Sequence, residues 1–329
     1  MPMKLPSLYP IKFHPQLKEK VWGGRQLALQ YDKEADGNIG ESWEISGVAE
    51  SVSTVSNGVF EGRPLTELIE LYSDELLGKS VIQRFGNEFP LLFKFIDARE
   101  DLSVQLHPND AVARKRHNSF GKTEMWYVLH AEENARLILG FNREMDSRTY
   151  QAYLSENKIT DILHAEKVDK GDAFFIAPGT VHAIGAGVML AEIQQTSDIT
   201  YRIYDWDRPG IDGNMRELHN EEALDVIDYN APNAKLNFTE LENQSVEVCT
   251  SAYFTTNSLK LTEGIERNIS KIDSFIVYMC IDGQAVIGVN NRTEEIKKGE
   301  TLLIPASESL LSIETKGATL LEVYVPSAL

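Results

Sequence analysis

Four side chains that could bind a metal ion stand at the ends of strand-like segments of this 329-residue chain. The first two are Gln105 and His107, in Leu102-Ser-Val-Gln-Leu-His-Pro108, where apolar and polar residues alternate. Because successive side chains of a strand point to opposite faces, both are expected on one face. Pro108 ends the strand, since it cannot donate to a ladder. A strand with one polar face is the alternative interpretation of this segment.

The other two candidates are Glu124 and His182. Glu124 opens the apolar segment Glu124-Met-Trp-Tyr-Val-Leu129, where an unpaired carboxylate would be costly. His182 ends the tight turn Pro178-Gly-Thr-Val-His182. Two imidazoles and a carboxylate are a usual zinc set, with a carboxamide oxygen as a fourth ligand, and the same set could hold iron or manganese. Each residue alone could be an ordinary polar or core residue, but together their order and turn contexts are typical of a cupin-type barrel.

A second group of candidates is cationic. Lys94 lies inside an apolar segment, Lys122 precedes Glu124 by two residues, and Arg202 lies in Tyr201-Arg-Ile-Tyr-Asp-Trp-Asp-Arg208. The acidic Glu192 shares a face of its predicted strand with Gln194. The alternatives are a snorkelling side chain for Lys94 and a structural ion pair for Arg202. Three cations near one metal in an acidic protein favour an anionic ligand such as a phosphate.

The composition limits the partners. The formal charge is −18, which argues against nucleic acid, because phosphates need a basic stripe. No stretch approaches the roughly 20 apolar residues of a membrane span, and the first residues show no secretory apolar region. The two cysteines, Cys249 and Cys280, are expected to be reduced core residues. We therefore expect a cytoplasmic protein without membrane or nucleic-acid partners.

Short apolar or alternating segments bounded by turn residues dominate the chain and indicate a sandwich or barrel. Ser51–Val55 is among the predicted strands. Helical insertions are predicted at about residues 64–88, where apolar residues follow a helical period, and at 147–163. Asn109 is expected to cap a short helix.

A faint internal repeat suggests two related barrels. Lys170-Gly-Asp-Ala-Phe-Phe-Ile-Ala-Pro-Gly-Thr-Val-His182 resembles Lys298-Gly-Glu-Thr-Leu-Leu-Ile-Pro-Ala-Ser-Glu-Ser309, and only the first copy keeps the histidine. We predict a mainly β chain of two cupin-type jelly-roll barrels, the second degenerate. The expected domains are a catalytic domain with the helical insertions at 1–235 and a C-terminal barrel at 236–329.

Taken together, these motifs resemble the type I mannose-6-phosphate isomerase (phosphomannose isomerase) family in its short bacterial form. The segments that carry the resemblance, in the family's order over most of residues 20–210, are Val21-Trp-Gly-Gly24, Gly40-Glu-Ser-Trp-Glu-Ile45, Phe89-Pro-Leu-Leu-Phe-Lys-Phe-Ile-Asp97, Leu102-Ser-Val-Gln-Leu-His-Pro108, Lys122-Thr-Glu124, Pro178-Gly-Thr-Val-His-Ala183 and Ser197-Asp-x-x-x-Arg202. Each segment alone is a weak signal, but the ordered series is specific.

The resemblance implies a metal-dependent aldose–ketose isomerase that interconverts D-mannose 6-phosphate and D-fructose 6-phosphate through a cis-enediol, with one Zn²⁺ per chain. The family's zinc ligands fall on Gln105, His107, Glu124 and His182. Its catalytic residues fall on Arg202, Glu192 and Lys94, and its substrate-binding residues on Lys122, Lys94 and Arg202. The sequence leaves a monomer and a homodimer open.

The sequence alone leaves two alternative functions open. A cupin dioxygenase could use iron or manganese on a similar ligand set, although an aromatic substrate would not need three cations. A non-catalytic cupin could bind a sugar phosphate without converting it.

Overall fold

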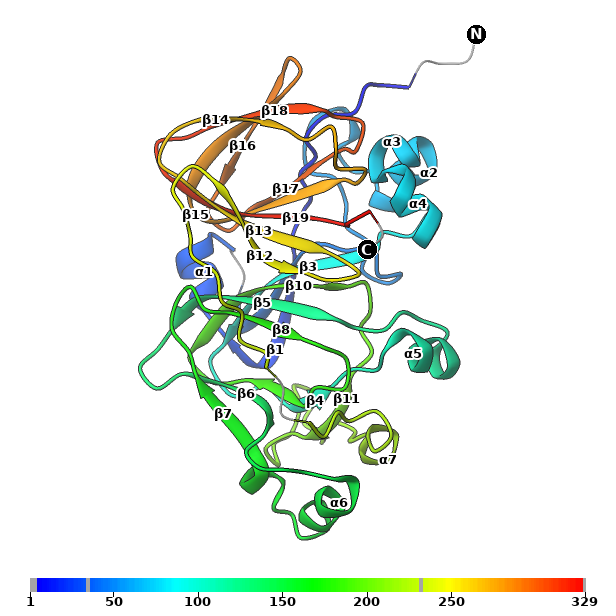
Figure 1. Ribbon diagram of the computed structural model, residues 1–329, viewed down its shortest axis with the longest axis vertical. Helices are drawn as coiled ribbons and strands as arrows, with labels where there is room; N and C mark the ends of the chain where they lie inside the picture. The colour runs from blue at the N-terminus through cyan, green and yellow to red at the C-terminus, as the bar shows by residue number, and fades with distance from the viewer. Residues whose placement is uncertain (1–4, 34–35, 231–232, 328–329) are drawn as a thin grey trace. The chain divides into compact units, whose positions relative to one another are not determined.

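Figure 1 shows a computed structural model of the chain, which describes residues 5–33, 36–230 and 233–327. The chain divides into two compact units. The site unit comprises Leu17–Trp43 and Phe93–Leu236, and the C-terminal unit comprises Met1–Gln16, Glu44–Leu92 and Asn237–Leu329. The predicted division into domains at 1–235 and 236–329 stays a prediction.

The site unit is built on two β-sheets, and the five-stranded one is antiparallel throughout. The six-stranded sheet has the order β1-β2-β3-β10-β5-β8, and its strands are β1 (Gln16–Gly24), β2 (Ile39–Ile45), β3 (Leu91–Ala98), β10 (Val188–Gln195), β5 (Glu124–Ala131) and β8 (Ala173–Ile176). The five-stranded sheet has the order β11-β4-β9-β6-β7, and its strands are β11 (Tyr201–Tyr204), β4 (Val104–Leu106), β9 (His182–Ile184), β6 (Arg136–Phe141) and β7 (Leu163–Lys167).

The core of the site unit lies between these sheets. One apolar cluster joins Trp126 and Val128 of the six-stranded sheet to Leu137 and Ile184 of the five-stranded sheet, so the two sheets face each other. A second cluster covers the outer face of the five-stranded sheet, against α6 (Ser147–Ser155), the 3₁₀ helix η2 (Ile159–Ile162) and α7 (Asn220–Ala223).

This arrangement explains how β4 presents its polar side chains. Val104 and Leu106 pack in the outer cluster, so the intervening Gln105 points toward the space between the sheets. After Pro108 the chain turns into α5 (Asp110–His117), and the side chain of Asn109 accepts a hydrogen bond from Val112 N at 3.0 Å. The predicted cap is confirmed. The remaining helix of this unit is α1 (Gln26–Tyr31).

The C-terminal unit contains a second β structure, coloured yellow to red in Figure 1. Its eight-stranded sheet consists of β12 (Ser245–Thr250), β13 (Thr255–Leu261), β14 (Ile265–Asn268), β15 (Ile276–Val289), β16 (Arg292–Lys297), β17 (Thr301–Ile304), β18 (Leu310–Glu314) and β19 (Ala318–Tyr324). The long strand β15 pairs with β16, β17, β18 and β19, which curls the sheet around one apolar cluster. The unit also holds the 3₁₀ helix η1 (Gly58–Phe60), α2 (Leu65–Tyr72), α3 (Asp74–Leu77) and α4 (Lys79–Phe85).

Most structural expectations are met. The mainly β fold is confirmed, Cys249 and Cys280 are buried free thiols, and helices occupy the first predicted insertion, although they are short. The second insertion is also helical, but it breaks between α6 and η2. The predicted strand Ser51–Val55 is wrong, because only isolated bridges at Thr54 and Val55 form there. None of the helices in the described ranges has the length and apolar character needed to cross a membrane.

Candidate metal and active site

Three of the four predicted metal donors meet inside the site unit. His107 follows β4, Glu124 begins β5 and His182 begins β9, so they come from both sheets. One donor atom from each lies within 4.8 Å of the others, and all three side chains are about 1% exposed. The sequence separation of these residues is large, but strand pairing brings them together.

Backbone carbonyls fix the orientation of both imidazoles. His107 Nδ1 lies 2.8 Å from the carbonyl oxygen of Ile199, and His182 Nδ1 lies 2.9 Å from that of Thr180. A carbonyl oxygen can only accept, so each Nδ1 is the protonated nitrogen that donates. The lone pair of each Nε2 is therefore available, and neither Nε2 makes a hydrogen bond within the described residues. A hydrogen bond from the ring nitrogen that does not bind the metal is typical of metal-bound histidines.

The distances between the donor atoms suit a bound cation. His107 Nε2 lies 3.2 Å from Glu124 Oε1, and His182 Nε2 lies 3.9 Å from Glu124 Oε2. Two ligands bound at about 2.0–2.1 Å to a tetrahedral ion are about 3.3 Å apart. Without a cation, two nitrogen lone pairs would face a carboxylate in a buried site, which is unfavourable. The residues present therefore fit a divalent metal ion.

The charge states agree with this interpretation. Burial, together with the neighbouring Lys122, lowers the pKa of His107 to about 3, and burial also lowers the pKa of His182. Burial alone would raise the pKa of Glu124, but the charge of Lys122 and contact with His107 hold it well below its usual value. At neutral pH the site thus offers two neutral imidazoles and one carboxylate, the protonation states that metal binding needs.

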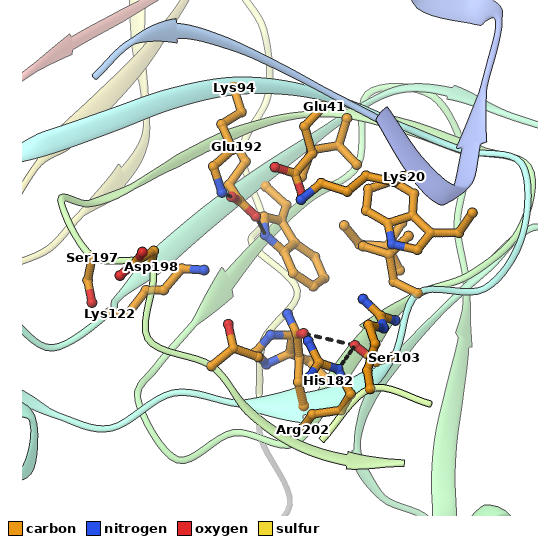
Figure 2. Close-up of a pocket in the computed structure, with 18 of the residues that line it drawn as sticks. Lys20, Glu41, Lys94, Ser103, Lys122, His182, Glu192, Ser197, Asp198 and Arg202 are labelled. Carbon is orange, nitrogen blue, oxygen red and sulfur yellow. Dashed lines mark hydrogen bonds and ion pairs between the residues drawn. The ribbon is translucent and has the colours of Figure 1, made fainter. Parts of the chain in front are cut away.

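Gln105, the fourth predicted ligand, lies next to this cluster. It is the register partner of His182 across β4 and β9 and of Arg202 across β4 and β11. Its Oε1 accepts a hydrogen bond from Ser103 Oγ at 3.2 Å, and Ser103 Oγ accepts one from Arg202 Nε at 3.3 Å, as drawn in Figure 2. His182, Gln105 and Arg202 therefore form a row across three neighbouring strands.

Lys94 and Glu192 form a buried ion pair on the six-stranded sheet. Lys94 Nζ lies 2.7 Å from Glu192 Oε1 and donates to Gln194 Oε1 at 2.6 Å. The snorkelling alternative for Lys94 is wrong, because its side chain is only 7% exposed. Burial would lower the pKa of Lys94, but the carboxylates of Glu192 and Glu41 raise it above its ordinary value. Burial and the charge of Glu124 raise the pKa of Glu192.

These groups share one cavity of about 340 Å³, a size suited to a small ligand. Its lining includes Lys94, Gln105, Lys122, His182, Glu192 and Arg202. Figure 2 shows that Lys94, Lys122 and Glu192 reach the cavity from one side and His182 and Arg202 from another. Lys122 Nζ lies 3.0 Å from Glu124 Oε1, which ties this cation to the metal cluster. Arg202 makes no ion pair in the part of the chain described, contrary to the alternative of a structural pair.

Several further residues line the cavity that sequence reasoning did not assign: Lys20, Trp22, Glu41, Trp43, Ser103, Trp126, Arg216 and His219. Glu41 Oε2 accepts a hydrogen bond from Trp43 Nε1 at 2.7 Å, and Glu41 Oε1 lies 3.4 Å from Lys20 Nζ. Burial opposes ionisation of Glu41, but Lys20 and Lys94 lower its pKa to about 2. The alternation of Glu41 and Trp43 within a predicted strand was the available signal for this pair.

Two stretches of the chain match family models of known enzymes. Residues 11–135 match the family model of the phosphomannose isomerase type I catalytic domain, and residues 245–325 match that of the mannose-6-phosphate isomerase cupin domain. The mannose-6-phosphate isomerase of Streptococcus mutans is 34% identical over 299 residues, covering 90% of this chain and 92% of that protein. The chain belongs to the type I phosphomannose isomerase family.

Further relatives are similar to this chain over nearly its whole length. The mannose-6-phosphate isomerase ManA of Bacillus subtilis is 34% identical over 302 residues, covering 90% of this chain and 93% of that protein. The crystal structure of the mannose 6-phosphate isomerase from Bacillus subtilis superimposes with a TM-score of 0.86 at 30% identity, covering 95% of this chain and 99% of that chain. An apo phosphomannose isomerase from Salmonella typhimurium shares the fold, with a TM-score of 0.76 at 18% identity.

Family membership confirms the enzyme class and the cupin fold. The chain is a metal-dependent aldose–ketose isomerase, and the dioxygenase and non-catalytic alternatives lose their support. A phosphosugar substrate fits this family and fits a cation-lined cavity in a chain with a formal charge of −18.

Proposed function

We propose that this enzyme interconverts D-mannose 6-phosphate and D-fructose 6-phosphate through a cis-enediol intermediate. The observation that carries the proposal is that one cavity is lined both by His182, a member of the buried His107–Glu124–His182 cluster, and by the ion pair of Lys94 and Glu192. An isomerisation of this kind moves a proton between C1 and C2, so it needs a base beside the carbon chain and an electrophile at the oxygens. The names of the relatives support the substrate.

The metal is proposed to be one Zn²⁺ per chain, held by His107, Glu124 and His182, with Gln105 as the fourth ligand. Two neutral imidazoles and a carboxylate are a typical zinc set, and the 3.2 Å between His107 Nε2 and Glu124 Oε1 is close to the spacing of two ligands of a tetrahedral ion. When bound, such an ion polarises a sugar oxygen and so makes the neighbouring C–H bond more acidic. Iron and manganese are the competing metals for this ligand set.

Glu192 is proposed as the base that moves the proton. Its carboxylate is held in place on both oxygens, because Oε1 accepts from Lys94 and Oε2 accepts from Trp126 Nε1 at 3.0 Å. The raised pKa of Glu192 brings it closer to neutral pH, which favours efficient proton transfer. Lys94 is held as an ammonium ion by its neighbouring carboxylates, so it acts as the donor that returns a proton or holds a sugar oxygen.

Arg202 is proposed to stabilise the negative charge that develops on the enediolate oxygen. It lies opposite Gln105 in the ladder, on the cavity side of β11. A guanidinium that is already oriented stabilises such charge without reorganisation. Lys122, together with Lys94 and Arg202, is proposed to contact the substrate, and its position beside Glu124 places it at the metal end of the cavity. Ser103 holds Arg202 and Gln105 in their relative orientation.

A cytoplasmic location and a monomeric or homodimeric state also remain proposals, and two buried free cysteines support a reducing compartment. The test of the function is a coupled assay with mannose 6-phosphate, run on protein of known zinc content. Turnover to fructose 6-phosphate that falls on chelation and returns with Zn²⁺ supports the proposal. Stable binding of the sugar phosphate without turnover would contradict it.

A further inference from the structure

A segment that follows β11 extends the wall of the cavity beyond the edge of the five-stranded sheet. The backbone N–H of His219 donates to the carbonyl of Arg202 at 2.7 Å, and the N–H of Arg202 donates to His219 Nδ1 at 3.2 Å. Arg202 Nη1 also donates to the carbonyl of Glu217 at 3.0 Å. Residues 217–219 therefore run beside the edge strand, and Arg216 and His219 line the same cavity as Arg202.

Arg216 is held in a fixed orientation by one carboxylate. Its Nε donates to Asp205 Oδ2 and its Nη2 to Asp205 Oδ1, both at 2.6 Å, and the Asp205 side chain is only 4% exposed. This contact uses one edge of the planar guanidinium. No other hydrogen bond to Arg216 forms within the described ranges, so the donors of its opposite edge remain available in the cavity wall.

Two guanidinium groups, Arg202 and Arg216, line this end of the cavity, and one buried carboxylate, Asp205, pairs with Arg216. Arg202 donates to the hydroxyl of Ser103 and to the carbonyl of Glu217, but it contacts no carboxylate within the described residues. Arg216 pairs with Asp205, and Arg208 lies further from the same carboxylate, at 3.5 Å. Burial and the repulsive like charge of Arg216 lower the pKa of Arg202, whereas the carboxylates of Asp205 and Glu217 raise it. An anionic ligand between them would relieve this repulsion.

The spacing of the strands gives the distance from the metal cluster. Residues His182, Gln105 and Arg202 are neighbours across β9, β4 and β11, and residues 217–219 form the next row. With about 4.8 Å between rows, that segment lies roughly 10 Å from Gln105 on β4, the proposed fourth ligand, and roughly 14 Å from His182 on β9. In an open-chain hexose 6-phosphate, six bonds separate C2 from phosphorus and span about 7 Å when extended. A sugar with its C1 and C2 oxygens beside Gln105 and His182 can therefore extend its phosphate across β11 toward Arg216, whose long side chain lines the same cavity.

We propose that Arg216, positioned by Asp205, binds the substrate phosphate beside Arg202 and is a specificity-determining residue of this enzyme. The identity of the sugar in this inference rests on the proposed function, whereas the binding of an anion by Arg216 does not. Lys94 and Lys122 fit this assignment, because each is already paired with a carboxylate at the reacting end of the cavity. Their contacts there are with sugar oxygens, and Arg216 supplies the recognition of the phosphate.

The test compares Arg216→Gln with Arg208→Gln in steady-state assays with mannose 6-phosphate, with inorganic phosphate as a competitive inhibitor. Arg208 is a matched control, because its Nη2 lies 3.5 Å from Asp205 Oδ1 but it does not line the cavity. Loss of charge-assisted hydrogen bonds to phosphate is expected to raise both KM and the inhibition constant of phosphate about 10–100-fold in Arg216→Gln, with kcat within about threefold. Arg208→Gln is expected to match the wild type.

The single variant Arg216→Gln removes hydrogen-bond donors and also leaves the Asp205 carboxylate without its main partner. A double variant, Asp205→Asn with Arg216→Gln, removes one charge of each sign, so it tests the loss of the donors alone. The same rise in KM in the double variant supports direct binding by Arg216. Values of KM and of the phosphate inhibition constant within twofold of the wild type, in either Arg216 variant, would overturn the inference, as would an equal rise in Arg208→Gln.

The outcomes also separate this inference from the proposed function. If wild-type protein fails to convert mannose 6-phosphate, the function falls, and line broadening of inorganic phosphate in ³¹P NMR still tests the anion site. Broadening with the wild type that is lost in Arg216→Gln supports the site, and equal broadening with both proteins contradicts it.

Discussion

Glu124 and Glu192 accept hydrogen bonds from the same donor, the indole N–H of Trp126, at 3.1 and 3.0 Å. The register of β10 against β5 places Glu192 opposite Trp126 and Gln194 opposite Glu124, so the arrangement follows from strand pairing. One indole therefore fixes both the carboxylate of the proposed metal cluster and that of the proposed base. The other oxygen of Glu124 lies near His107, and the other oxygen of Glu192 lies near Lys94.

Replacing Trp126 with phenylalanine tests this shared donor. Trp126→Phe keeps an aromatic ring in the core but removes the N–H, so both carboxylates lose one fixed hydrogen bond. We expect kcat to fall about tenfold or more while zinc stays bound, because a buried hydrogen bond to a charged group is worth about 1.5–3 kcal/mol. Trp206→Phe is the control, since that indole donates to the carbonyl of Leu102 instead. An unchanged kcat in Trp126→Phe would remove the indole from the mechanism.

Removal of either imidazole of the metal cluster should abolish metal binding and activity together. His107→Ala and His182→Ala each remove one of the converging donors from a buried site. Zinc content by elemental analysis and kcat are the two measurements. His164→Ala is the control, because that side chain is exposed beside Glu166. Full activity in a variant that has lost its zinc would refute the role of the metal.

Arg202 should affect turnover without affecting the metal. Arg202→Ala removes the guanidinium proposed to stabilise the enediolate, for which a single preorganised donor is typically worth about 10²–10³ in kcat. Zinc content is expected to match the wild type, because Arg202 contacts Ser103 and Glu217 rather than the histidines. If kcat stays at the wild-type level, Arg202 has no part in the chemistry.

The acid limb of the pH–kcat profile should report Glu192. A base must be unprotonated to accept the proton, so activity is lost as the pH falls through its pKa. Since burial and Glu124 raise the pKa of Glu192, this limb should lie above the ordinary glutamate value of 4.5. Lys94 lowers that pKa, so Lys94→Met should move the limb to higher pH and reduce kcat. A limb that stays in place or moves to lower pH in Lys94→Met would exclude Glu192 as the titrating base.

The C-terminal unit offers a prediction about stability alone. Glu322 is fully buried and accepts from Tyr278 at 2.6 Å, Arg267 at 2.7 Å and Asn257 at 3.0 Å. Glu322→Leu leaves Arg267 without its carboxylate and should reduce the free energy of unfolding by about 3–5 kcal/mol. Urea unfolding measures the change. A loss of less than about 1 kcal/mol would show that the network contributes little.

The sequence predicted that His107, Glu124 and His182 would lie together because the signals for each are local. The alternation around Gln105 and His107, the cost of an unpaired Glu124 and the turn before His182 each lie within a few residues. The partners of these groups could not be predicted in the same way. Lys94 pairs with Glu192, 98 residues away, and Trp126 bridges two strands only because of their register.

Residues outside regular strands were harder still to predict. Arg216 reaches the cavity through a segment whose path depends on Asp205 and on backbone contacts with Arg202, and its sequence reads as a polar linker. The predicted strand at Ser51–Val55 failed for a related reason, because β-rich composition alone does not supply a pairing partner.

The central claim is that His107, Glu124 and His182 hold one metal ion at the reacting end of the cavity. Anomalous diffraction at the zinc edge, on crystals of active enzyme, tests it most directly. The claim predicts a single peak in each chain, about 2.0–2.2 Å from the Nε2 atoms of both histidines and from a carboxylate oxygen of Glu124. A peak held by other residues, or no peak in fully active crystals, would contradict it.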